Sequence, residues 1–418
     1  MSALESAASA PPRRGALRRL WQQLPQSTRR QLLFDVSRVI APQPDKRPRG
    51  GFPIGIAGLF STASGIGEGA RLAYAALEGE GYAPSAFDLS PAFGQVEFRA
   101  AAERRELGGG DGGGTIIVHH NGPFTPHALW ALGRARIRGR RIIGYWAWEL
   151  PRLPADWQPS FNYVHEIWVP SRFTRDAIAA ATDKPVHVVP HPLPSATITP
   201  DMRGKLGLPA DALLVLNVVH LGSAFARKNP LAAIQAFRHA FGERKDRVLM
   251  IKVVAGGATL WAQRALDQAI WGAENIRLVE GMLPEADMSG LIAASDIVIS
   301  LHRSEGFGLV PAQAMQLGKP VIATAWSGNL EFMTERNSAL VSCALVPVRD
   351  PDGVFDGGGQ SWADANVEEA AGWLKRLADD ASLRAAMGTV AAKDVTAQLS
   401  PKTFAAKIAG LINAGARA

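Results

Sequence analysis

The sequence has very little cysteine: Cys343 is the single one in 418 residues. One thiol excludes an internal disulfide framework and any metal or iron–sulfur site built from several cysteines. Long apolar runs are also missing, because no segment approaches the roughly 20 apolar residues that span a bilayer. The N-terminus shows no uninterrupted apolar stretch of a secretory signal. With 47% hydrophobic residues the chain can bury a large core, so we expect a soluble, cytoplasmic protein of two or three domains.

Basic residues are unevenly distributed along the chain. Residues 1–50 contain ten Lys and Arg against three Asp and Glu, which accounts for the whole net charge of +7. The other 368 residues hold 35 of each sign and are neutral. Because nucleic-acid binding needs cations clustered on the folded surface, this distribution argues against a nucleic-acid partner.

The basic segment also carries apolar residues at helical spacing. The residues with this spacing are Leu17, Leu20, Trp21 and Leu24, then Leu32, Leu33, Val36, Val39 and Ile40. A basic amphipathic helix either lies on an anionic membrane surface or packs on the body of the protein with its basic face in solvent. The sequence leaves both alternatives open, so residues 13–49 are a candidate for peripheral contact with the inner face of a membrane.

From residue 53 onward, short apolar runs alternate with helical stretches and end at turn residues. This alternation is typical of βαβ units around a parallel sheet. We expect strands at 53–59, 85–89, 115–119, 141–145, 166–169 and 186–189, and then at 213–218, 248–254, 276–279, 297–301, 320–323 and 340–342. The Pro-rich stretch 191–201 between the two series predicts an interdomain linker.

The predicted fold is therefore α/β, with two doubly wound Rossmann-like domains that face each other across a cleft. We place a basic helical arm at 1–50, the first domain at 51–195 and the second at 202–390. We expect the C-terminal helix (391–418) to pack back on the first domain. Ligands should bind at the carboxyl ends of the strands.

A glycine pattern follows the first expected strand. Gly65, Gly67 and Ala70 match the dinucleotide-type G-x-G-x-x-A, and Asp88 follows near the end of the second strand. Glycines let backbone amides approach a diphosphate at the start of a helix. However, the loop before Gly65 is longer than the tight turn of a nicotinamide site. Binding of NAD or FAD is one alternative for this loop.

A carboxylate precedes a helix in segment 304–320, directly after the expected strand 297–301. Gly306 and Gly308 bracket a loop, and Pro311 opens the helix. Glu305 would repel a diphosphate, but it can accept hydrogen bonds from neutral hydroxyls while loop amides hold the phosphates. A sugar nucleotide offers both kinds of group.

Two adjacent cations, Arg227 and Lys228, stand between the strand 213–218 and the helix 231–240. At the carboxyl end of a strand, such a pair can hold a pyrophosphate, whose charge grows as it leaves. The alternative is a solvated basic surface, which is common for a pair of this kind.

These segments, taken together and in order, resemble the group 1 glycosyltransferases, the retaining GT-B enzymes of glycosyltransferase family 4, and in particular their bacterial branch. The matching segments are 144–151, 166–171, 225–230, 304–313, 318–324 and 327–333. The resemblance implies a GT-B fold and transfer of a hexosyl-type sugar from a nucleotide-diphosphate sugar to an acceptor hydroxyl, with retention. The implied acceptor is a saccharide or lipid-linked saccharide in polysaccharide or glycolipid assembly.

The resemblance also implies roles for individual residues. Glu305 would be the first glutamate of the family's E-x7-E motif and would reach the donor sugar's hydroxyls. Lys228 would neutralise the leaving diphosphate, and His120 would lie near the anomeric carbon unless it is an ordinary strand-end residue. The other implied donor-binding residues are Gly306, Phe307, Gly308, Leu309, Gln313, Arg227, Ser327, Gly328 and Asn329. Gly65 and Gly67 would form the phosphate and acceptor loop on the N-terminal side of the cleft. The resemblance implies that the first domain is the acceptor side and the second domain the donor side.

Two departures from the family pattern stand out. The second motif glutamate, expected at the nucleotide ribose, is Gln313. This change replaces a charge-assisted hydrogen bond (about 1.5–3 kcal/mol) by a neutral one (about 0.5–1.5 kcal/mol). Secondly, the stretch 221–224 lacks the arginine that many members carry before the clamp lysine, and Arg227 is a candidate substitute.

We expect no metal and no cofactor, because Lys228 and helix N-termini can stabilise the leaving group. The literal D-x-D at Asp350 and Asp352 lies in a Pro- and Gly-rich loop and predicts a turn. Tryptophans 146, 148 and 157 either stack on a sugar or pack in the core. The alternative functions are a sugar-nucleotide epimerase or hydrolase, an inactive sugar-nucleotide binder, and an NAD-dependent oxidoreductase.

Overall fold

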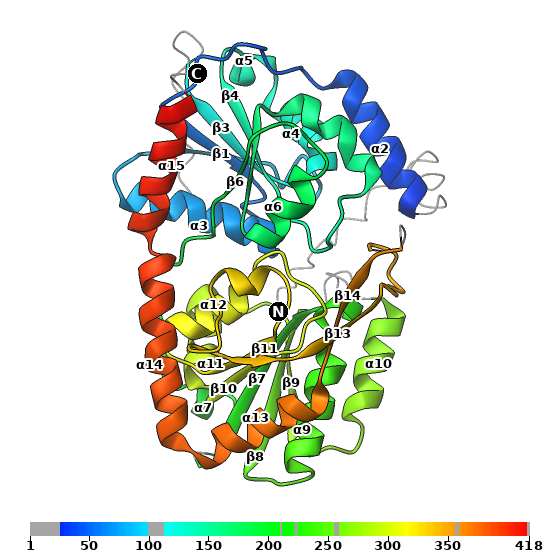
Figure 1. Cartoon of the computed structure of the whole chain (residues 1–418), viewed down its shortest axis with the longest axis vertical. Coiled ribbons are helices and arrows are strands. Elements are labelled where there is room, and N and C mark those ends of the chain that lie inside the picture. Colours follow the sequence, from blue (N-terminus) through cyan, green and yellow to red (C-terminus); the bar gives the residue numbers. More distant parts are fainter. Residues whose placement is uncertain are drawn as a thin grey trace, which may run out of the picture.

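The computed structural model describes residues 26–98, 113–209, 211–221, 225–254, 259–355 and 359–415. This part of the chain forms two domains, each built on a six-stranded parallel sheet, one above the other in Figure 1. Three sequence features lie outside the described residues: the apolar group at 17–24, most of the glycine-dense stretch 106–114, and the loop 222–224 before the cation pair.

The first domain contains a sheet of order β2-β1-β3-β4-β5-β6. Its strands are β1 (Ile54–Gly58), β2 (Ser85–Asp88), β3 (Thr115–His119), β4 (Arg141–Tyr145), β5 (Glu166–Val169) and β6 (Val186–Val188). The helices are α2 (Gln26–Ile40), α3 (Gly65–Gly79), α4 (Thr125–Leu132), α5 (Arg134–Ile137) and α6 (Arg172–Ala179), with the short 3₁₀ helices η1 (Gly122–Phe124) and η2 (Ala155–Tyr163). β1, β3 and β5 are buried along their whole length, as expected for parallel strands covered on both faces.

The second domain contains a sheet of order β12-β11-β10-β7-β8-β9. Its strands are β7 (Leu213–His220), β8 (Arg247–Val254), β9 (Ile276–Glu280), β10 (Ile297–Ser300), β11 (Val321–Thr324) and β12 (Ala339–Val341). The helices are α7 (Met202–Lys205), α8 (Phe225–Lys228), α9 (Pro230–Phe241), α10 (Leu260–Ile270), α11 (Glu285–Ala294), α12 (Leu309–Gln316), α13 (Val367–Asp379) and α14 (Ala381–Gln398), with the 3₁₀ turn η3 (Gly328–Glu331). Separate apolar clusters fill the two faces of this sheet.

Every strand that the sequence predicts in the two sheets is present, with ends that differ by at most two residues. The predicted two-domain α/β fold is confirmed. Among the described residues, no helix combines the length and the apolar character needed to cross a bilayer.

The chain crosses between the domains at two adjacent places. The first crossing is the predicted linker, and the second lies between α14 and α15 (Pro401–Gly415). The backbone N–H of Leu193 donates to the carbonyl of Leu399 at 2.7 Å, which joins the two crossings. α15 then packs on the first domain, where Phe404, Ile408 and Ile412 join the cluster around β1. In Figure 1, α14 runs beside the lower domain and α15 beside the upper one.

An antiparallel hairpin follows the last strand of the second sheet, and the sequence analysis did not predict it. It consists of β13 (Cys343–Pro347) and β14 (Ser361–Ala365). At its described end Asp350 accepts hydrogen bonds from the backbone of Val354 and Phe355 at 2.9 and 3.0 Å, so the first aspartate of the D-x-D holds a turn. The hairpin reaches the first domain, since Phe355 packs against Trp148 with ring centroids 5.5 Å apart.

The helix α2 has two different faces. Phe34, Ser37 and Ala41 are buried, and Phe34 packs edge-on against Phe124 at 5.1 Å. The opposite face exposes four apolar side chains: Leu32 and the residues four, seven and eight positions after it, which are Val36, Val39 and Ile40. The helix therefore packs on the body and also presents an apolar stripe to the outside.

Candidate active site

The cation pair and the carboxylate meet at the carboxyl edge of the second sheet. β7 leads to α8, which carries Arg227 and Lys228, and the neighbouring strand β10 leads to Glu305. Lys228 Nζ lies 2.5 Å from Glu305 Oε1, and Arg227 donates from a terminal nitrogen to Glu305 Oε2 at 3.1 Å. Parallel neighbours end at the same edge of a sheet, so residues 77 and 78 positions apart in sequence come into contact.

This ion-pair cluster is largely withdrawn from solvent. Glu305 is 8% exposed and Arg227 is 5% exposed. Burial alone would raise the pKa of Glu305, but Lys228 and Arg227 together outweigh it and lower this pKa to about 2. Burial lowers the pKa of Lys228, and Glu305 opposes that effect. Glu305 is therefore ionised at neutral pH and matched by two cations.

A second carboxylate, Glu149, faces the same cluster from the first domain, and sequence reasoning did not single it out as a site residue. Burial raises its pKa, Arg227 opposes this, and Glu305 adds to it. Ser304 Oγ donates to the backbone carbonyl of Glu149, which joins the two domains beside Glu305. The sequence feature that could have identified Glu149 is its position shortly after β4, at the carboxyl edge of the first sheet.

The predicted residues Ser327, Gly328 and Asn329 support the loop that carries Glu305. Ser327 Oγ accepts from the Glu305 backbone N–H at 2.8 Å, and the Gly328 N–H donates to the Glu305 carbonyl at 2.9 Å. An added Cβ at Gly328 would overlap the Gly306 carbonyl, so glycine is required there. Asn329 is fully buried and donates to the Thr324 carbonyl at 3.0 Å.

The remaining predicted donor residues lie along the loop and the start of α12. Gly308, at φ +98°, is the N-cap residue of α12, which begins at Leu309. Phe307 is buried, with its ring 5.2 Å from His191 and 5.0 Å from Phe332. Gln313 is half-buried on α12, and its side chain has no hydrogen-bond partner among the described residues.

The glycine loop of the first domain is held by its own side chains. Ser64 caps α3 by accepting from Gly67 N–H at 3.1 Å, and Gly67 has no room for a Cβ beside the Leu59 and Thr62 carbonyls. A Cβ at Gly65 would meet open space. Asp88 accepts from Ser61 Oγ at 2.6 Å and from Ser90 N–H at 2.9 Å. These bonds fix the position of the Asp88 carboxylate at the end of β2.

His120 lies in an aromatic surrounding within the first domain. Its ring centroid is 4.5 Å from both Phe93 and Phe124, and its Nδ1 accepts from the Asn121 N–H at 3.0 Å. Burial lowers the pKa of His120 to about 3, so the ring is neutral at physiological pH. The neighbouring His119 stacks on Tyr145 at 4.3 Å. The structure thus does not bring His120 into contact with the Glu305 cluster.

The tryptophans 146, 148 and 157 form part of the first domain's core. All three are at most 4% exposed and pack on one another edge to face. Core packing, the second of the two alternatives, is the one confirmed. These rings are not presented to a sugar.

Comparison with known proteins agrees with this geometry. Residues 216–360 match the family model described as glycosyl transferases group 1. The chain is 31% identical over 191 residues to a D-inositol 3-phosphate glycosyltransferase from Xylanimonas cellulosilytica, over 43% of this chain and 41% of that protein. A second protein of this description, from a Nocardioides species, is 30% identical over 42% of this chain and 38% of its own length. The chain thus spans about two fifths of the length of these curated relatives.

Solved structures share the fold over most of the chain. The Anabaena protein Alr3699/HepE in complex with UDP-glucose matches with a TM-score of 0.62 and 16% identity, over 86% of this chain and 99% of that one. Sucrose-phosphate synthase from Thermosynechococcus elongatus matches with a TM-score of 0.63 and 15% identity, over 87% of this chain and 98% of that one. At such identities the likeness concerns the fold. Residues 216–360 are thus similar to the group 1 glycosyltransferases in sequence, and the chain shares the two-domain GT-B fold of these solved structures.

Proposed function

We propose that the protein transfers a hexosyl-type sugar from a nucleotide-diphosphate sugar to an acceptor hydroxyl, with retention of configuration. The observation that carries this proposal is the cluster of Lys228 and Arg227 on Glu305, at the carboxyl edge of the second sheet and against the first domain. Complexes of structural relatives contain UDP and UDP-glucose, so uridine diphosphate sugars are the donors to test first.

The cluster supplies what glycosyl transfer requires. Lys228 and Arg227 carry positive charge where a diphosphate leaves, and charge stabilisation in a buried site is effective because its dipoles are already oriented. A diphosphate would compete with Glu305 for these cations, which frees the carboxylate to accept hydrogen bonds from the donor's sugar hydroxyls. In a retaining reaction of this kind the departing phosphate takes the acceptor's proton.

We propose turnover without a metal ion, because Lys228 and Arg227 already balance the charge of the leaving diphosphate. An excess of chelator should therefore leave the rate unchanged. An epimerase or hydrolase would use the same donor site and differ in its products. An NAD-dependent oxidoreductase would bind at the loop of Gly65 and would leave the ion pair of Lys228 and Glu305 without a role.

The test is release of nucleoside diphosphate from a panel of nucleotide sugars, with product analysis for transfer. Glu305→Gln keeps the shape of the side chain and removes its charge, and we expect at least a hundredfold lower turnover. Glu274→Gln is the matched control, because Glu274 is an exposed partner of Lys245. A Glu305→Gln enzyme with wild-type turnover would overturn the assignment.

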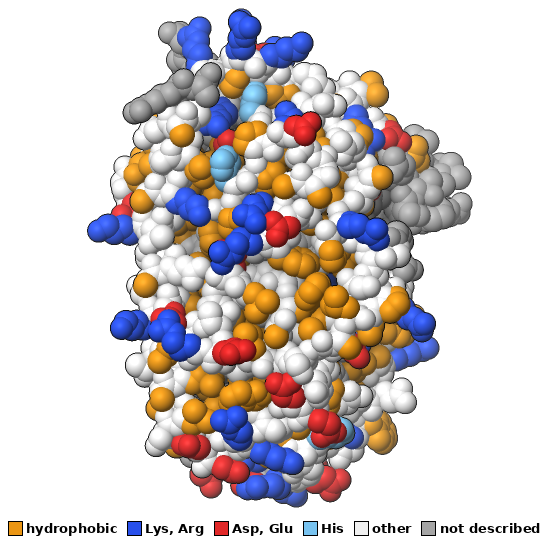
Figure 2. All heavy atoms as spheres, viewed as in Figure 1, with side chains coloured by type: hydrophobic (Ala, Val, Ile, Leu, Met, Phe, Trp, Pro, Cys, Tyr) orange, Lys and Arg blue, Asp and Glu red, His pale blue; other side chains and the backbone are white. Residues whose placement is uncertain are grey.

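We also propose that the stripe on α2 rests on an anionic membrane surface, so that the protein works peripherally on the inner face. Val39 is 86% exposed, and Trp130 on the adjoining α4 is 48% exposed. Exposed cations lie nearby, since Arg134 of α5 pairs with Asp45 and so holds the segment of Lys46 and Arg47 against this end of the domain. Figure 2 shows Lys and Arg side chains gathering at that end.

Vesicle sedimentation tests this contact. Wild-type protein should bind vesicles containing phosphatidylglycerol and not pure phosphatidylcholine, and Val39→Asp should reduce the bound fraction severalfold. The control Trp271→Ala changes an equally exposed apolar residue of the second domain. Equal binding by Val39→Asp and wild-type protein would contradict the proposal.

A further inference from the structure

The segment directly after β4 alternates between the core of the first domain and its outside. Trp146, Trp148 and Leu150 are buried in that core, whereas Ala147 and Glu149 between them are half-buried. Alternation of this kind is typical of an extended segment, in which successive side chains point to opposite sides. The side chains of Ala147 and Glu149 therefore share the side that faces away from the core.

That side lies against the loop of the second domain that carries Glu305. Ser304 Oγ donates to the backbone carbonyl of Glu149. A Cβ built at Gly306 would lie 3.6 Å from the Cβ of Ala147 and also 3.6 Å from the carbonyl oxygen of the next residue. Glu305 stands between these two contact points, so the backbone holds Glu149 beside it at the domain boundary.

The charged groups that act on Glu149 come from two elements of the second domain. Arg227 and Lys228 of α8 favour its ionised form, and Glu305 opposes it. Both cations are already paired with Glu305, at 3.1 and 2.5 Å. The carboxylate of Glu149 has no ion pair or hydrogen bond with another residue in the described part of the chain. Because burial is the largest influence, the pKa of Glu149 is raised.

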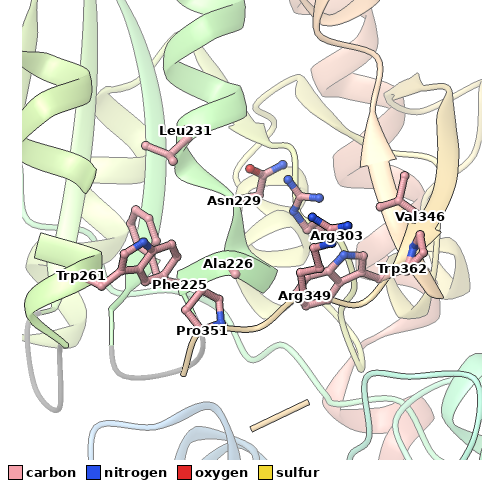
Figure 3. Close-up of a pocket in the computed structure, with 11 residues that line it drawn as sticks. Phe225, Ala226, Asn229, Leu231, Trp261, Arg303, Val346, Arg349, Pro351 and Trp362 are labelled. Carbon is pink, nitrogen blue, oxygen red and sulfur yellow. The ribbon is translucent and has the colours of Figure 1, made fainter. Parts of the chain in front are cut away.

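Three further ionisable residues near the cluster are engaged elsewhere or neutral. Asp350 faces Arg227 from the β13–β14 hairpin, where its carboxylate holds the turn. Arg303 lines a separate pocket of about 460 Å³, shown in Figure 3, and pairs with Asp364 at 2.9 Å. His302 is fully buried, and burial lowers its pKa, so it is neutral at physiological pH. The charge that Glu149 meets is therefore set by the cation pair and Glu305.

A bound nucleotide sugar changes the charge balance of this cluster. Without ligand, Arg227 and Lys228 face two carboxylates, Glu305 and Glu149. The diphosphate adds two negative charges beside the same cations, and each of them repels both carboxylates. Glu305 starts from a pKa of about 2 and gains the sugar hydroxyls as hydrogen-bond donors, so it stays ionised. Glu149 starts from a raised pKa with no partner, so its ionised form is the one that the ligand disfavours most.

We propose that Glu149 takes up a proton from solvent when a nucleotide sugar binds, and that the neutral acid then donates a hydrogen bond to the diphosphate. One O–H bond forms on the carboxylate, the proton comes from water or buffer, and no bond of the nucleotide sugar breaks. The half-buried side chain is open to solvent for this exchange. This role rests on the proposed function, because it needs a diphosphate at Lys228 and Arg227. Affinity for the nucleotide sugar should therefore fall as the pH rises.

Calorimetry in buffers of different ionisation enthalpy counts the protons that binding takes up. The probe is the nucleotide sugar that binds, beginning with UDP-glucose, whose diphosphate does not titrate near neutral pH. Wild-type protein should take up a clear fraction of one proton, and its Kd should rise about tenfold between about pH 6.5 and about pH 8.5. Glu149→Gln is neutral and keeps a hydrogen-bond donor. It should take up no proton, and its Kd should be independent of pH.

The matched control is Glu274→Gln, which removes an exposed carboxylate of the second domain and should take up protons as wild type does. Uptake that persists in Glu149→Gln would place the proton on another group, such as Lys228 or the neighbouring His220, and would overturn the proposal. Lys228-dependent binding without uptake in wild type would overturn the role of Glu149 alone and leave the proposed function intact. If no nucleotide sugar bound, or if binding did not depend on Lys228, the proposed function would fail and the role of Glu149 with it.

Discussion

Ser171 of the first domain donates a hydrogen bond of 2.7 Å to the carbonyl oxygen of Gly306 in the second domain. Gly306 follows Glu305 directly, so the loop that carries the candidate donor-binding carboxylate is fixed in part by the other domain. Nearby, the backbone N–H of Arg172 donates to Glu331 at 2.8 Å, and Phe173 packs on Trp326 at 5.7 Å. The position of the two domains and the shape of the donor loop are therefore coupled.

Ser171→Ala should weaken donor binding as well as stability. The change removes the bond to Gly306 and the cap of α6, where Ser171 accepts from Thr174 N–H. We expect a loss of about 1–2 kcal/mol in unfolding free energy and a severalfold weaker affinity for a nucleoside diphosphate. Urea unfolding and calorimetry measure the two effects.

The control for this variant is Asn366→Ala, which removes the N-cap of α13 far from the domain boundary. It should cost similar stability and leave the affinity unchanged. Equal affinities of the two variants would show that the Ser171 bond does not shape the donor site.

Lys228→Ala should lower kcat by about a hundredfold to a thousandfold, the usual effect of removing one preorganised charge-stabilising donor. Lys228→Arg keeps the charge and should recover part of the rate. Lys245→Ala, which removes an exposed lysine paired with Glu274, should have no effect. Steady-state kinetics with a saturating donor separates these outcomes, and an unaffected kcat in Lys228→Ala would contradict the assigned role.

The sheets could be predicted from the sequence because buried parallel strands are continuous apolar runs that end at turn residues. β13 and β14 escaped prediction for a physical reason. Their faces are partly exposed, thirteen residues separate them, and the hairpin gains part of its burial from the first domain through Phe355 and Trp148. The residue pattern of these two strands does not indicate a packing partner in the other domain.

The same distinction applies to the site. Arg227, Lys228 and Glu305 stand at the ends of neighbouring strands, so their meeting follows from topology. Glu149 meets them only because the domains face each other in one particular arrangement, which the strand pattern does not specify. Phe307 also depends on that arrangement, since its partner His191 belongs to the linker.

The pH dependence of the unfolding free energy should reveal the ion pairing of Glu305. Its pKa lies at about 2 in the folded protein against an ordinary value of 4.5, so the folded state gains stability above about pH 4.5. This contribution, of about 3 kcal/mol, is lost as the pH falls from 4.5 towards 2. Wild type and Glu305→Gln should thus differ most at neutral pH and converge only at about pH 2 and below. A difference in unfolding free energy that is independent of pH would contradict the ion pairing.

Glu149 gives the contrasting case for the same measurement. Its pKa is raised by burial, so its ionised form destabilises the folded state above that pKa. Glu149→Gln should be more stable than wild type at neutral pH, and the gain should vanish below the ordinary glutamate value.

Gln313→Glu should tighten the binding of a nucleoside diphosphate. The carboxylate would give a ribose hydroxyl a charge-assisted hydrogen bond in place of a neutral one, a gain of about 1 kcal/mol or roughly fivefold in Kd. Gln268→Glu on the remote α10 adds the same charge at an exposed position and serves as the control. If both variants changed Kd equally, net charge rather than contact with the ribose would be the cause.

The most direct test of the central claim is a binding panel of UDP, GDP, ADP, dTDP, CMP, NAD and NADP on wild type and Lys228→Ala. Ligand at a hundred times its Kd should add about 2.7 kcal/mol to the unfolding free energy and raise the melting temperature. We predict that one nucleoside diphosphate does so and that Lys228→Ala weakens its binding at least tenfold. Stabilisation by NAD or NADP alone, with no dependence on Lys228, would contradict the claim and direct attention to the loop at Gly65.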